Sequence, residues 1–385
     1  MERIQIRFYD ADTIDDLPWP DTKDGQYAKQ FLVPFVKRQP SHYINNVQAR
    51  YLAVSLDGIV LPISITETQY DNSYVCSPYT HYVSYAKQEL VLLQSALLRK
   101  GLSALLSGLG QLFKASQINK AVHVNNWFVS TNLYPELTPD QLRALHSFLT
   151  EQFPDYAIIY RSLNEANHGD LIQEFRRLNY KWVASRQIYL VHPSQSASVS
   201  SKPRKLLKKD YALIARHDYE MLDHDQLSDQ DISRILELYN ALYLQKYSMY
   251  NPQFNEDFIA LAIKNKILHL QALRKNGRID AVIGYFCRNG VMTTPLLGYD
   301  LSLPREIGLY RMLSALLFYI ALDNGHLLNR SSGAAHFKRK RGAAAEVEYS
   351  AVYDRHLPFP RRLCWSFLQT VINKIGIPLI RKYKL

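Results

Sequence analysis

Hydrophobic positions along residues 210–385 repeat with two different periods, and each period predicts a type of element. After Ser228 the apolar residues recur every three or four positions, which predicts a helix, and a second helix follows over about residues 254–266. The next two apolar runs are rich in β-branched residues and flank Asn276 and Gly277, a dipeptide typical of hairpin turns. We therefore expect two helices followed by an antiparallel hairpin.

The rest of this half continues as strand, helix, strand, helix, strand. The expected elements are a strand over 291–300, a helix over 309–324 that stops at Gly325, a short strand before Asn329, a helix opening at 332–334 and stopping at Gly342, and a strand over 346–353. Residues 1–192 close in a similar way, with a helix over about 167–178 and a strand that ends near Val191. The chain therefore consists of two halves that end alike.

A change of composition separates the halves. Residues 193–209, PSQSASVSSKPRKLLKK, are rich in Ser, Pro and Lys and have no apolar period, which is typical of a solvated linker. We predict an N-terminal domain over 1–192, the linker over 193–209 and a C-terminal domain over 210–385.

Composition and charge narrow the class of protein. The 385 residues are 47% hydrophobic and carry a formal charge of +11, which favours an anionic partner: nucleic acid, phospholipid or a phosphorylated cofactor. Three scattered cysteines do not make a disulfide framework or a cysteine-rich zinc site, and we expect no metal. The start of the chain is acidic and lacks a secretory pattern, so we expect a cytoplasmic protein. The motifs GxxxxGK, GxGxxG, HExxH and GxSxG are missing, which disfavours kinases, dinucleotide enzymes, zinc proteases and serine hydrolases.

The element order of the second half resembles the GCN5-related acetyltransferase (GNAT) fold, and two such halves resemble the FemAB-type peptidyltransferases. The match is carried by Asn329 at the end of the expected fifth strand, followed by Phe337, Lys338, Gly342 and Ala343. The first half repeats this pattern less well, at Asn164, Phe175, Arg176, Asn179 and Tyr180. The resemblance implies an α/β (α+β) fold of two GNAT-like domains, the first degenerate, each with a mixed, splayed central sheet flanked by helices.

The resemblance also implies a reaction and a donor. An acyl or aminoacyl group would pass from a thioester or ester to an amine by direct attack, with the donor lying where the fourth and fifth strands separate. The implied donors are acyl-CoA, an acyl carrier protein and aminoacyl-tRNA, and the acceptor is a small-molecule or lipid-linked amine. Backbone N–H groups at a helix N-terminus suit a cofactor diphosphate, and the positions expected to bind the cofactor are Arg305, Gly308, Leu309, Tyr310, Arg311 and Asn329. Acyl-CoA is the donor expected first, but only Arg305 and Gly308 match the usual family loop, which strengthens the alternatives of an acyl carrier protein and aminoacyl-tRNA.

Three side chains are candidates for proton transfer. Asp300 ends the expected fourth strand, where such enzymes often place a general base, and Tyr299 beside it is the candidate general acid. His336 is a third candidate, because histidine is a common general acid or base. The alternatives are a turn before Pro304 for the first two residues and a surface position for the histidine.

Candidate substrate-binding residues lie in both halves. Lys338 and Arg341 share a helical face and would hold an anionic group, unless the run is simply a solvated charged face. The others are Ser331 and Ser332, which could instead cap the helix, and Asn132, Tyr134 and Arg161 near strand ends, where turn roles are the alternative.

Two long apolar segments leave alternatives open. Residues 363–385 combine aromatic and basic residues, which suits either the surface of an anionic membrane at its inner face or a helix docked on the core. Residues 90–113 would form either a buried helix or the wall of an acyl-chain tunnel. A rival function is a non-catalytic GNAT-like protein that binds nucleic acid or an anionic membrane through its basic C-terminus.

Overall fold

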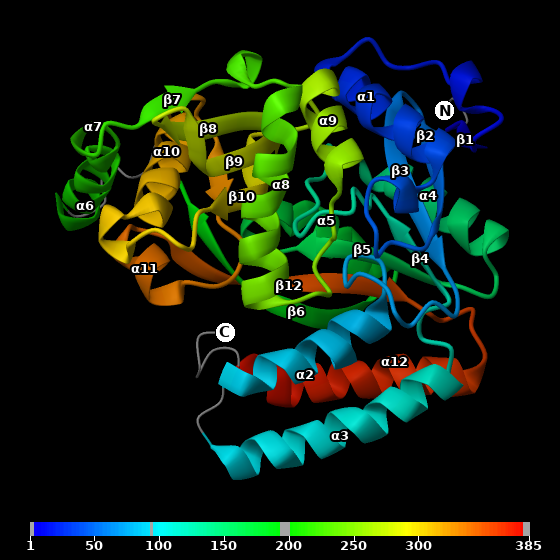
Figure 1. Cartoon of the computed structure of the whole chain (residues 1–385). Helices are drawn as coiled ribbons and strands as arrows, with labels where there is room; N and C mark the ends of the chain where they lie inside the picture. The colour runs from blue at the N-terminus through cyan, green and yellow to red at the C-terminus, as the bar shows by residue number, and fades with distance from the viewer. Residues whose placement is uncertain (1–3, 93–94, 193–200, 380–385) are drawn as a thin grey trace. The chain divides into compact units, whose positions relative to one another are not determined.

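A computed structural model describes residues 4–92, 95–192 and 201–379 (Figure 1). The chain divides into two compact units. Unit 1 comprises Met1–Arg186, Tyr250–Gln253 and Val347–Leu385, and unit 2 comprises Gln187–Met249 and Phe254–Glu346. Each unit is described by itself below.

Unit 1 is built on a mixed sheet. Its main elements are β1 (Ile6–Tyr9), α1 (Lys23–Arg38), β2 (Arg50–Leu56), β3 (Ile59–Thr66), α2 (Ala86–Glu89), α3 (Ala96–Ala115), β4 (Ala121–Val124), α4 (Pro139–Gln152), β5 (Ala157–Leu163), α5 (Glu165–Arg177), the start of β6 (Lys181–Val191), most of β12 (Ala344–Tyr353) and α12 (Phe359–Val371). Strands β1 to β4 are antiparallel neighbours, β4 and β5 are parallel, and β12 lies antiparallel to β5. The sheet of unit 1 is therefore mixed, with β4 and β5 as its parallel pair.

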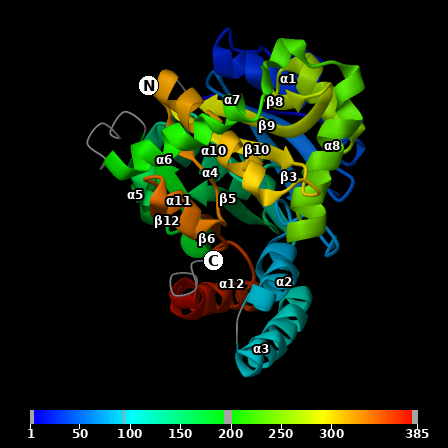
Figure 2. The same cartoon turned by 60° about the vertical axis from the view of Figure 1, so that its left-hand side comes forward.

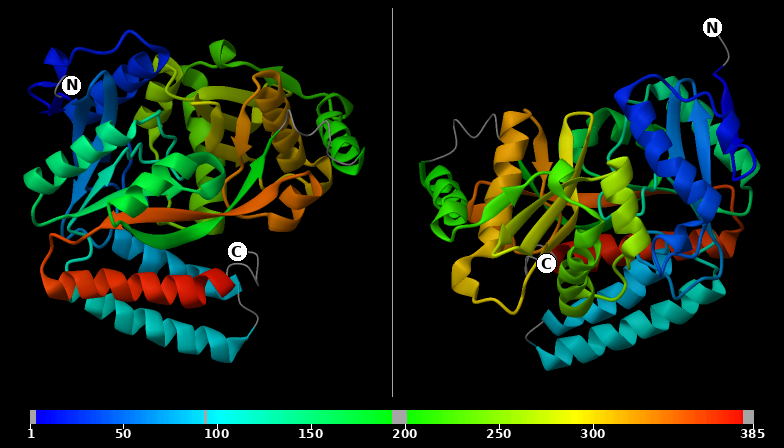
Figure 3. Two further views of the ribbon diagram at one scale, coloured as in Figure 1. Left: turned by 180° about the vertical axis from the view of Figure 1, so that it is seen from behind. Right: turned by 45° about the horizontal axis from the view of Figure 1, so that its top comes forward.

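Helices cover the sheet of unit 1 with two apolar clusters. One contains Leu142, Leu145 and Leu149 of α4 and Phe175 of α5, packed on β2 to β5. The other joins α3 and α12 to the sheet through Phe113, Trp365 and neighbouring apolar side chains. Figures 1 and 3 show α3 and α12 lying side by side with α2. These three helices therefore form one helical layer.

Unit 2 contains the helices and strands predicted between residues 228 and 342, together with further elements between residues 201 and 222 that were not predicted. Its elements are the end of β6, α6 (Ser201–Tyr211), α7 (Leu213–Arg216), β7 (Glu220–Leu222), α8 (Ile232–Asn240), α9 (Glu256–Asn265), β8 (His269–Lys275), β9 (Arg278–Arg288), β10 (Val291–Tyr299), α10 (Leu309–Asp323), β11 (Leu327–Asn329), α11 (Ala335–Lys340) and the start of β12. The predicted hairpin turn is confirmed, because Asn276 and Gly277 have φ angles of 51° and 77° between β8 and β9. The sheet order is β6-β11-β10-β9-β8-β7.

The two faces of this sheet bury different helices. Ala281 and Ile283 of β9 join the apolar cluster of α10, while Gly298 of β10 faces α8. A Cβ at Gly298 would lie 2.6 Å from the carbonyl carbon of Leu238, so the close approach of α8 requires glycine. Figure 2 shows β9 and β10 between α8 and α10.

The compact units differ from the predicted domains at the C-terminus. We expected residues 210–385 to form one domain, but Val347–Leu385 belong to unit 1. The reason is strand pairing: Tyr349 and Val352 of β12 pair with Leu163 and Ile159 of β5. In the same way, the end of β6 pairs with β11 of unit 2, at Leu190↔Asn329.

The predicted linker is also shorter than expected. Residues 193–200 lie outside the described residues, and residues 201–209 belong to helix α6. Leu207 of this helix is buried in the apolar cluster of unit 2, and Asp210 at its end is fully buried. A single apolar anchor in a basic helix produces too little periodicity to stand out in the sequence.

The segment 90–113 is not a buried helix, and its role as the wall of an acyl-chain tunnel stays a prediction. Residues 93 and 94 lie outside the described residues, and α3 buries Leu109, Gly110 and Phe113 while exposing most of its remaining length. No helix within the described ranges combines the length and apolarity needed to cross a bilayer.

Candidate active site in the second unit

The two parallel strands of unit 2 separate as the resemblance implied. Val291, Met292 and Thr293 of β10 pair with Leu327, Leu328 and Asn329 of β11, where β11 ends. Strand β10 continues to Tyr299 without its parallel partner, and an irregularity between Thr293 and Leu296 interrupts its pairing with β9. Among the described residues, β11 therefore forms no ladder pairs with β10 beyond Thr293.

Buried polar atoms without a partner gather at the point of separation. Within the described residues, Thr293 Oγ1, Thr294 Oγ1 and Arg330 Nη1 are buried and have no hydrogen-bond partner. Arg330 follows directly after β11, its other Nη contacts Ser314, and its guanidinium lies 5.7 Å from the ring centroid of Phe337. Burial lowers the pKa of this guanidinium. Tyr310 also forms a side-chain hydrogen bond with this guanidinium, so Nη1 is the donor that a ligand could satisfy, and a buried donor without a partner costs free energy. Sequence reasoning missed this residue although it lies next to Asn329.

Asp300 is placed at the end of β10 as predicted, but its surroundings hold it as a carboxylate. It accepts hydrogen bonds from Arg234 at 2.6 Å and from the Ser302 amide at 2.9 Å, and Arg278 lies 3.2 Å away. Burial raises the pKa of Asp300, but the hydrogen bonds from Ser302 and Arg234 outweigh it and lower the pKa to about 2. A carboxylate with so low a pKa is a poor general base near neutrality.

Tyr299 lies on the face of the sheet that α10 covers, beside the opening. Its ring centroid is 6.1 Å from that of Tyr310, and Lys246 Nζ donates to its hydroxyl at 3.4 Å. Burial raises the pKa of Tyr310, so its phenol is neutral at physiological pH. Two phenols and a lysine ammonium therefore stand at the end of the open strand edge.

The cationic side chains that were predicted to bind an anion interact mostly with other groups of the protein. Lys338 is buried and donates to the carbonyl oxygens of Arg330 and Ser332 at 2.6 and 2.7 Å. Asp210, fully buried, bridges Arg311 at 2.7 Å and Arg341 at 2.5 Å. These interactions give the three cations a structural role, since a second anion would have to compete with internal partners.

The loop before α10 fits a diphosphate only in part. Gly308 has a φ of +81° and begins the helix, which requires glycine, and Arg305 is exposed. However, the amides of Ile307 and Gly308 bond to Pro304 and Arg305 in a tight turn, and Leu309 is a core residue. The amides of Leu309 and Tyr310 belong to the first turn of α10, which makes no i→i−4 bond.

The remaining predicted residues of unit 2 surround the turn after β11. Asn329 is buried, and its Oδ1 accepts from the Ser331 amide at 2.9 Å. The carbonyls of Ser331 and Ser332 accept from Lys338, and α11 begins only at Ala335, so neither serine caps that helix in the structure. His336 points to solvent on α11, as expected for a surface histidine.

An open groove of unit 2 lies at the turn between β8 and β9. It is lined by His217, Tyr219, Lys275, Asn276, Arg278, Asp280, Leu303 and Ile307. Lys275 donates to the carbonyl of His217 at 2.7 Å, and Arg278 pairs with Asp300. Among the described residues, no three His, Cys, Asp or Glu side chains are grouped so that they could hold a metal ion.

The corresponding strand end of unit 1 is filled. Strands β4 and β5 pair in parallel as far as Val124↔Tyr160, and the following segment, residues 125–134, is almost entirely buried. It brings the predicted residues together: the Asn132 amide donates to Ser162 at 2.9 Å, and Tyr134 donates to the Arg161 carbonyl at 2.5 Å. This segment takes the place that an extended ligand would need.

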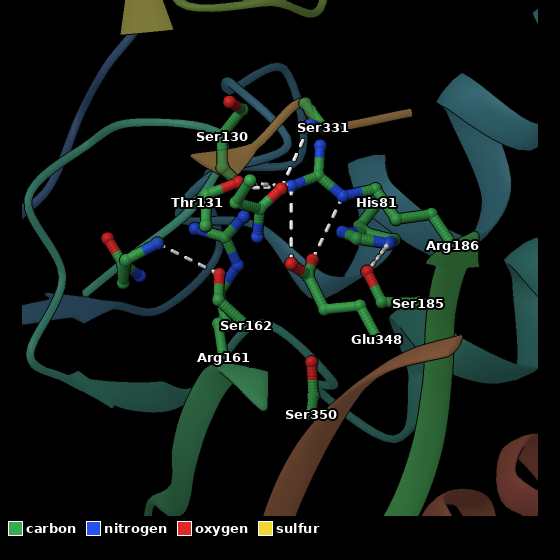
Figure 4. Close-up of polar contacts among 12 residues, drawn as sticks. His81, Ser130, Thr131, Arg161, Ser162, Ser185, Arg186, Ser331, Glu348 and Ser350 are labelled. Atoms are coloured by element: carbon green, nitrogen blue, oxygen red, sulfur yellow. Dashed lines mark hydrogen bonds and ion pairs between the residues drawn. The ribbon is translucent and has the colours of Figure 1, made fainter. Parts of the chain in front are cut away.

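A buried polar cluster that the sequence did not predict lies beside Arg161 (Figure 4). Arg186 donates to Glu348 at 2.9 Å and to the Thr131 hydroxyl at 2.9 Å. His81 lies 3.2 Å from the Ser185 hydroxyl, and burial together with the charges of Arg161 and Arg186 lowers its pKa to about 3. A neutral histidine with this pKa is too weak a base to activate a serine at neutral pH. The cluster therefore joins β5, β6 and β12 within unit 1.

Comparison with known proteins finds similar solved structures. No protein-family profile matches the chain, and no curated protein does. The chain is similar to the solved structures of L-PGS from Bacillus licheniformis (16% identity, TM-score 0.44, covering 59% of this chain and 76% of that one) and of FemX (8%, 0.42, 60% and 80%). It is also similar to a tandem GNAT protein from the clavulanic acid biosynthesis pathway (8%, 0.39, 91% and 98%).

The two units share one order of elements. Each has antiparallel strands, a helix (α4 or α10), a strand parallel to the one before that helix, and a further helix (α5 or α11). In unit 2 the parallel strands separate, and in unit 1 the same place is filled. This chain therefore has a tandem GNAT-like fold.

Proposed function

We propose that the protein is an acyl- or aminoacyl-transferase whose donor lies along the open edge of β10 in unit 2. The separation of β10 from β11 beyond Thr293, next to the unpaired Arg330 Nη1, is the observation that carries this proposal. Peptide N–H and C=O groups of an unpaired strand edge suit an extended, amide-containing acyl carrier. A phosphate or carbonyl oxygen of the donor would satisfy the guanidinium.

The residues fit an extended arm better than a complete coenzyme A. The edge of β10 and Arg330 would hold the arm, and Arg305 with the first turn of α10 would meet a phosphate. Two of the loop amides are already bonded within the turn at Ile307 and Gly308. The donor class therefore stays open between acyl-CoA, an acyl carrier protein and aminoacyl-tRNA.

Transfer would proceed by direct attack of an amine on the donor carbonyl. A C–N bond forms and the C–S or C–O bond to the carrier breaks. In this proposal Tyr299 protonates the leaving sulfur or oxygen, and the ammonium formed on the acceptor returns that proton to the phenolate. Asp300 does not serve as the base, because its carboxylate oxygens accept hydrogen bonds from Arg234 and Ser302 and its pKa is low.

The experiment is a transfer assay with the full chain, read by native and intact mass spectrometry. The donors are acetyl-CoA, palmitoyl-CoA, an acylated carrier protein and a mixture of aminoacyl-tRNAs. We expect Arg330→Ala to weaken donor retention by about tenfold or more, with partial rescue by Arg330→Lys. Arg339→Ala, an exposed arginine on α11, is the matched control and should retain the donor fully.

A proton-transfer role for Tyr299 has its own variant. We expect Tyr299→Phe to lower kcat by about 10²-fold with little effect on donor retention. Transfer at full rate by both Tyr299→Phe and Arg330→Ala would refute the site. An absence of binding and transfer with every donor would refute the function itself.

The rival function is a non-catalytic binder that uses the basic C-terminal region. Two of the cations on which it rests have partners inside the protein. Lys338 and Arg341 are committed to internal carbonyls and to Asp210. The cations of residues 380–385 lie outside the described residues. We therefore do not prefer this function.

A further inference from the structure

Helix α3 carries two apolar rows, and unit 1 buries only one of them. The inner row includes Leu109 and Phe113, which join the cluster beneath the sheet. The outer row is Leu97, Leu105 and Leu112, and the Leu97 side chain is 83% exposed. Gly101, Ala104 and Gly108 lie at intervening positions on the same side, so no charged residue interrupts this row.

Helix α12 repeats the arrangement. Its inner side chains Cys364, Trp365 and Leu368 are buried in the same cluster. Phe359, Leu363 and Phe367 follow one another every four residues on its other side, with exposures of 70%, 57% and 40%. Two segments far apart in the sequence therefore expose apolar rows from one helical layer (Figure 3).

The charges of the two helical segments themselves all have one sign. Residues 95–116 and 355–379 contain seven Lys or Arg and no Asp or Glu. Lys100 is exposed on α3, and Arg362 and Lys374 are exposed on α12 and the turn after it, whereas Lys114 packs over the rings of Tyr70 and Tyr79. We call the six apolar residues Leu97, Leu105, Leu112, Phe359, Leu363 and Phe367, together with the cations Lys100, Arg362 and Lys374, the outer face.

We propose that the outer face binds the surface of an anionic phospholipid bilayer. Exposed leucine and phenylalanine rows enter the boundary between headgroups and acyl chains, while lysine and arginine beside them meet lipid phosphates. A second copy of this chain is a poorer occupant, because a symmetric contact would bring the same three cations of each copy together. The inference is independent of the donor site in unit 2.

The experiment is flotation of the full chain with vesicles of phosphatidylcholine, with and without phosphatidylglycerol. We expect binding to the phosphatidylglycerol vesicles that falls as salt concentration rises, because the headgroup attraction is screened. Binding to the pure phosphatidylcholine vesicles should be weaker. Equal binding to both, or none to either, would overturn the proposal.

Variants of the outer face locate the contact. Leu97→Asp combined with Leu363→Asp should weaken partitioning by about tenfold for each leucine. Arg362→Glu combined with Lys374→Glu should abolish the preference for phosphatidylglycerol. Met221→Asp, an equally simple charge change at an exposed apolar residue of unit 2, is the control and should bind as the parent does.

Two further measurements keep the result interpretable. Circular dichroism melting should show that the variants fold, since all four substituted side chains are at the surface. The mass of the lipid-free protein in solution should correspond to one copy. A dimer that Leu97→Asp and Leu363→Asp dissociate, with no vesicle binding by the parent, would show that the outer face is a contact between copies and would overturn the proposal.

Discussion

Replacing Asp210 by asparagine should destabilise unit 2 far more than its position in a Ser- and Lys-rich segment suggests. Its two carboxylate oxygens accept from Arg311 Nε at 2.7 Å and from Arg341 Nε at 2.5 Å, and the carboxylate is fully buried. Asparagine preserves the shape but removes the charge that neutralises both guanidiniums. The Arg341 side chain is only 8% exposed, so most of the loss comes from this partner, whereas Arg311 is 41% exposed and partly hydrated.

The expected loss is about 3–5 kcal/mol, the range for removing one partner of a buried ion pair. At a slope of about 2–3 kcal/mol per molar urea, the unfolding midpoint should fall by about 1–2 M. The assay is equilibrium urea unfolding followed by far-UV circular dichroism. Asp225→Asn is the matched control, because its partner Lys266 and the carboxylate itself are both mainly exposed.

A double variant tests the cause of the loss. If the uncompensated guanidinium is responsible, Arg341→Met should recover part of the stability lost in Asp210→Asn, because no buried charge is then left unpaired. A loss below about 1 kcal/mol in Asp210→Asn, the value typical of an exposed pair, would refute the reasoning. Additive losses in the double variant would do the same.

Two further predictions concern single positions of unit 2. Gly298→Ala should lower stability by about 1–3 kcal/mol in thermal unfolding, because its Cβ would overlap the backbone of Leu238; Gly169→Ala, with open space around its Cβ, should not. Unit 2 should also lose stability in acid through Asp300. Its folded pKa is lowered from 3.8 to about 2, so its contribution, on the order of 2 kcal/mol, is complete above the unfolded pKa and disappears as pH falls through the folded value. Asp300→Asn should flatten this part of the stability profile, and an unchanged profile would contradict the assignment. The rate of acyl transfer by the Asp300→Asn variant should show no new pH dependence near neutrality, where a general base would have titrated.

Local chemistry was sufficient to predict most elements of the second half. Asn276 and Gly277 adopt the left-handed conformations that a two-residue turn requires, and those conformations depend on the two residues themselves. Gly325 and Gly342 end α10 and α11 for the same reason, with φ angles of 66° and 83°. The separation of β10 and β11 at Asn329 was implied by the resemblance to the GNAT fold and not by local chemistry.

Side-chain roles at the site could not be read in the same way. Lys338 looks like an anion-binding residue in a basic run, but a short helix and a turn place three carbonyl oxygens around its ammonium. Asp300 occupies the predicted position, but its carboxylate forms an ion pair with Arg234, which lies 66 residues away in the sequence. Arg330 gains its significance only because burial leaves one nitrogen without a partner.

The sequence by itself determined most helices and strands of the second half and that two similar halves follow one another, because apolar period, turn residues and helix stops act within a few positions. Only the tertiary structure decided that residues 347–385 belong to unit 1, that Asp210 neutralises two arginines, and that α3 exposes an apolar row. Strand pairing, ion pairing and burial depend on residues that the fold brings together from distant parts of the chain. The spacing of apolar residues along the sequence does not identify those partners.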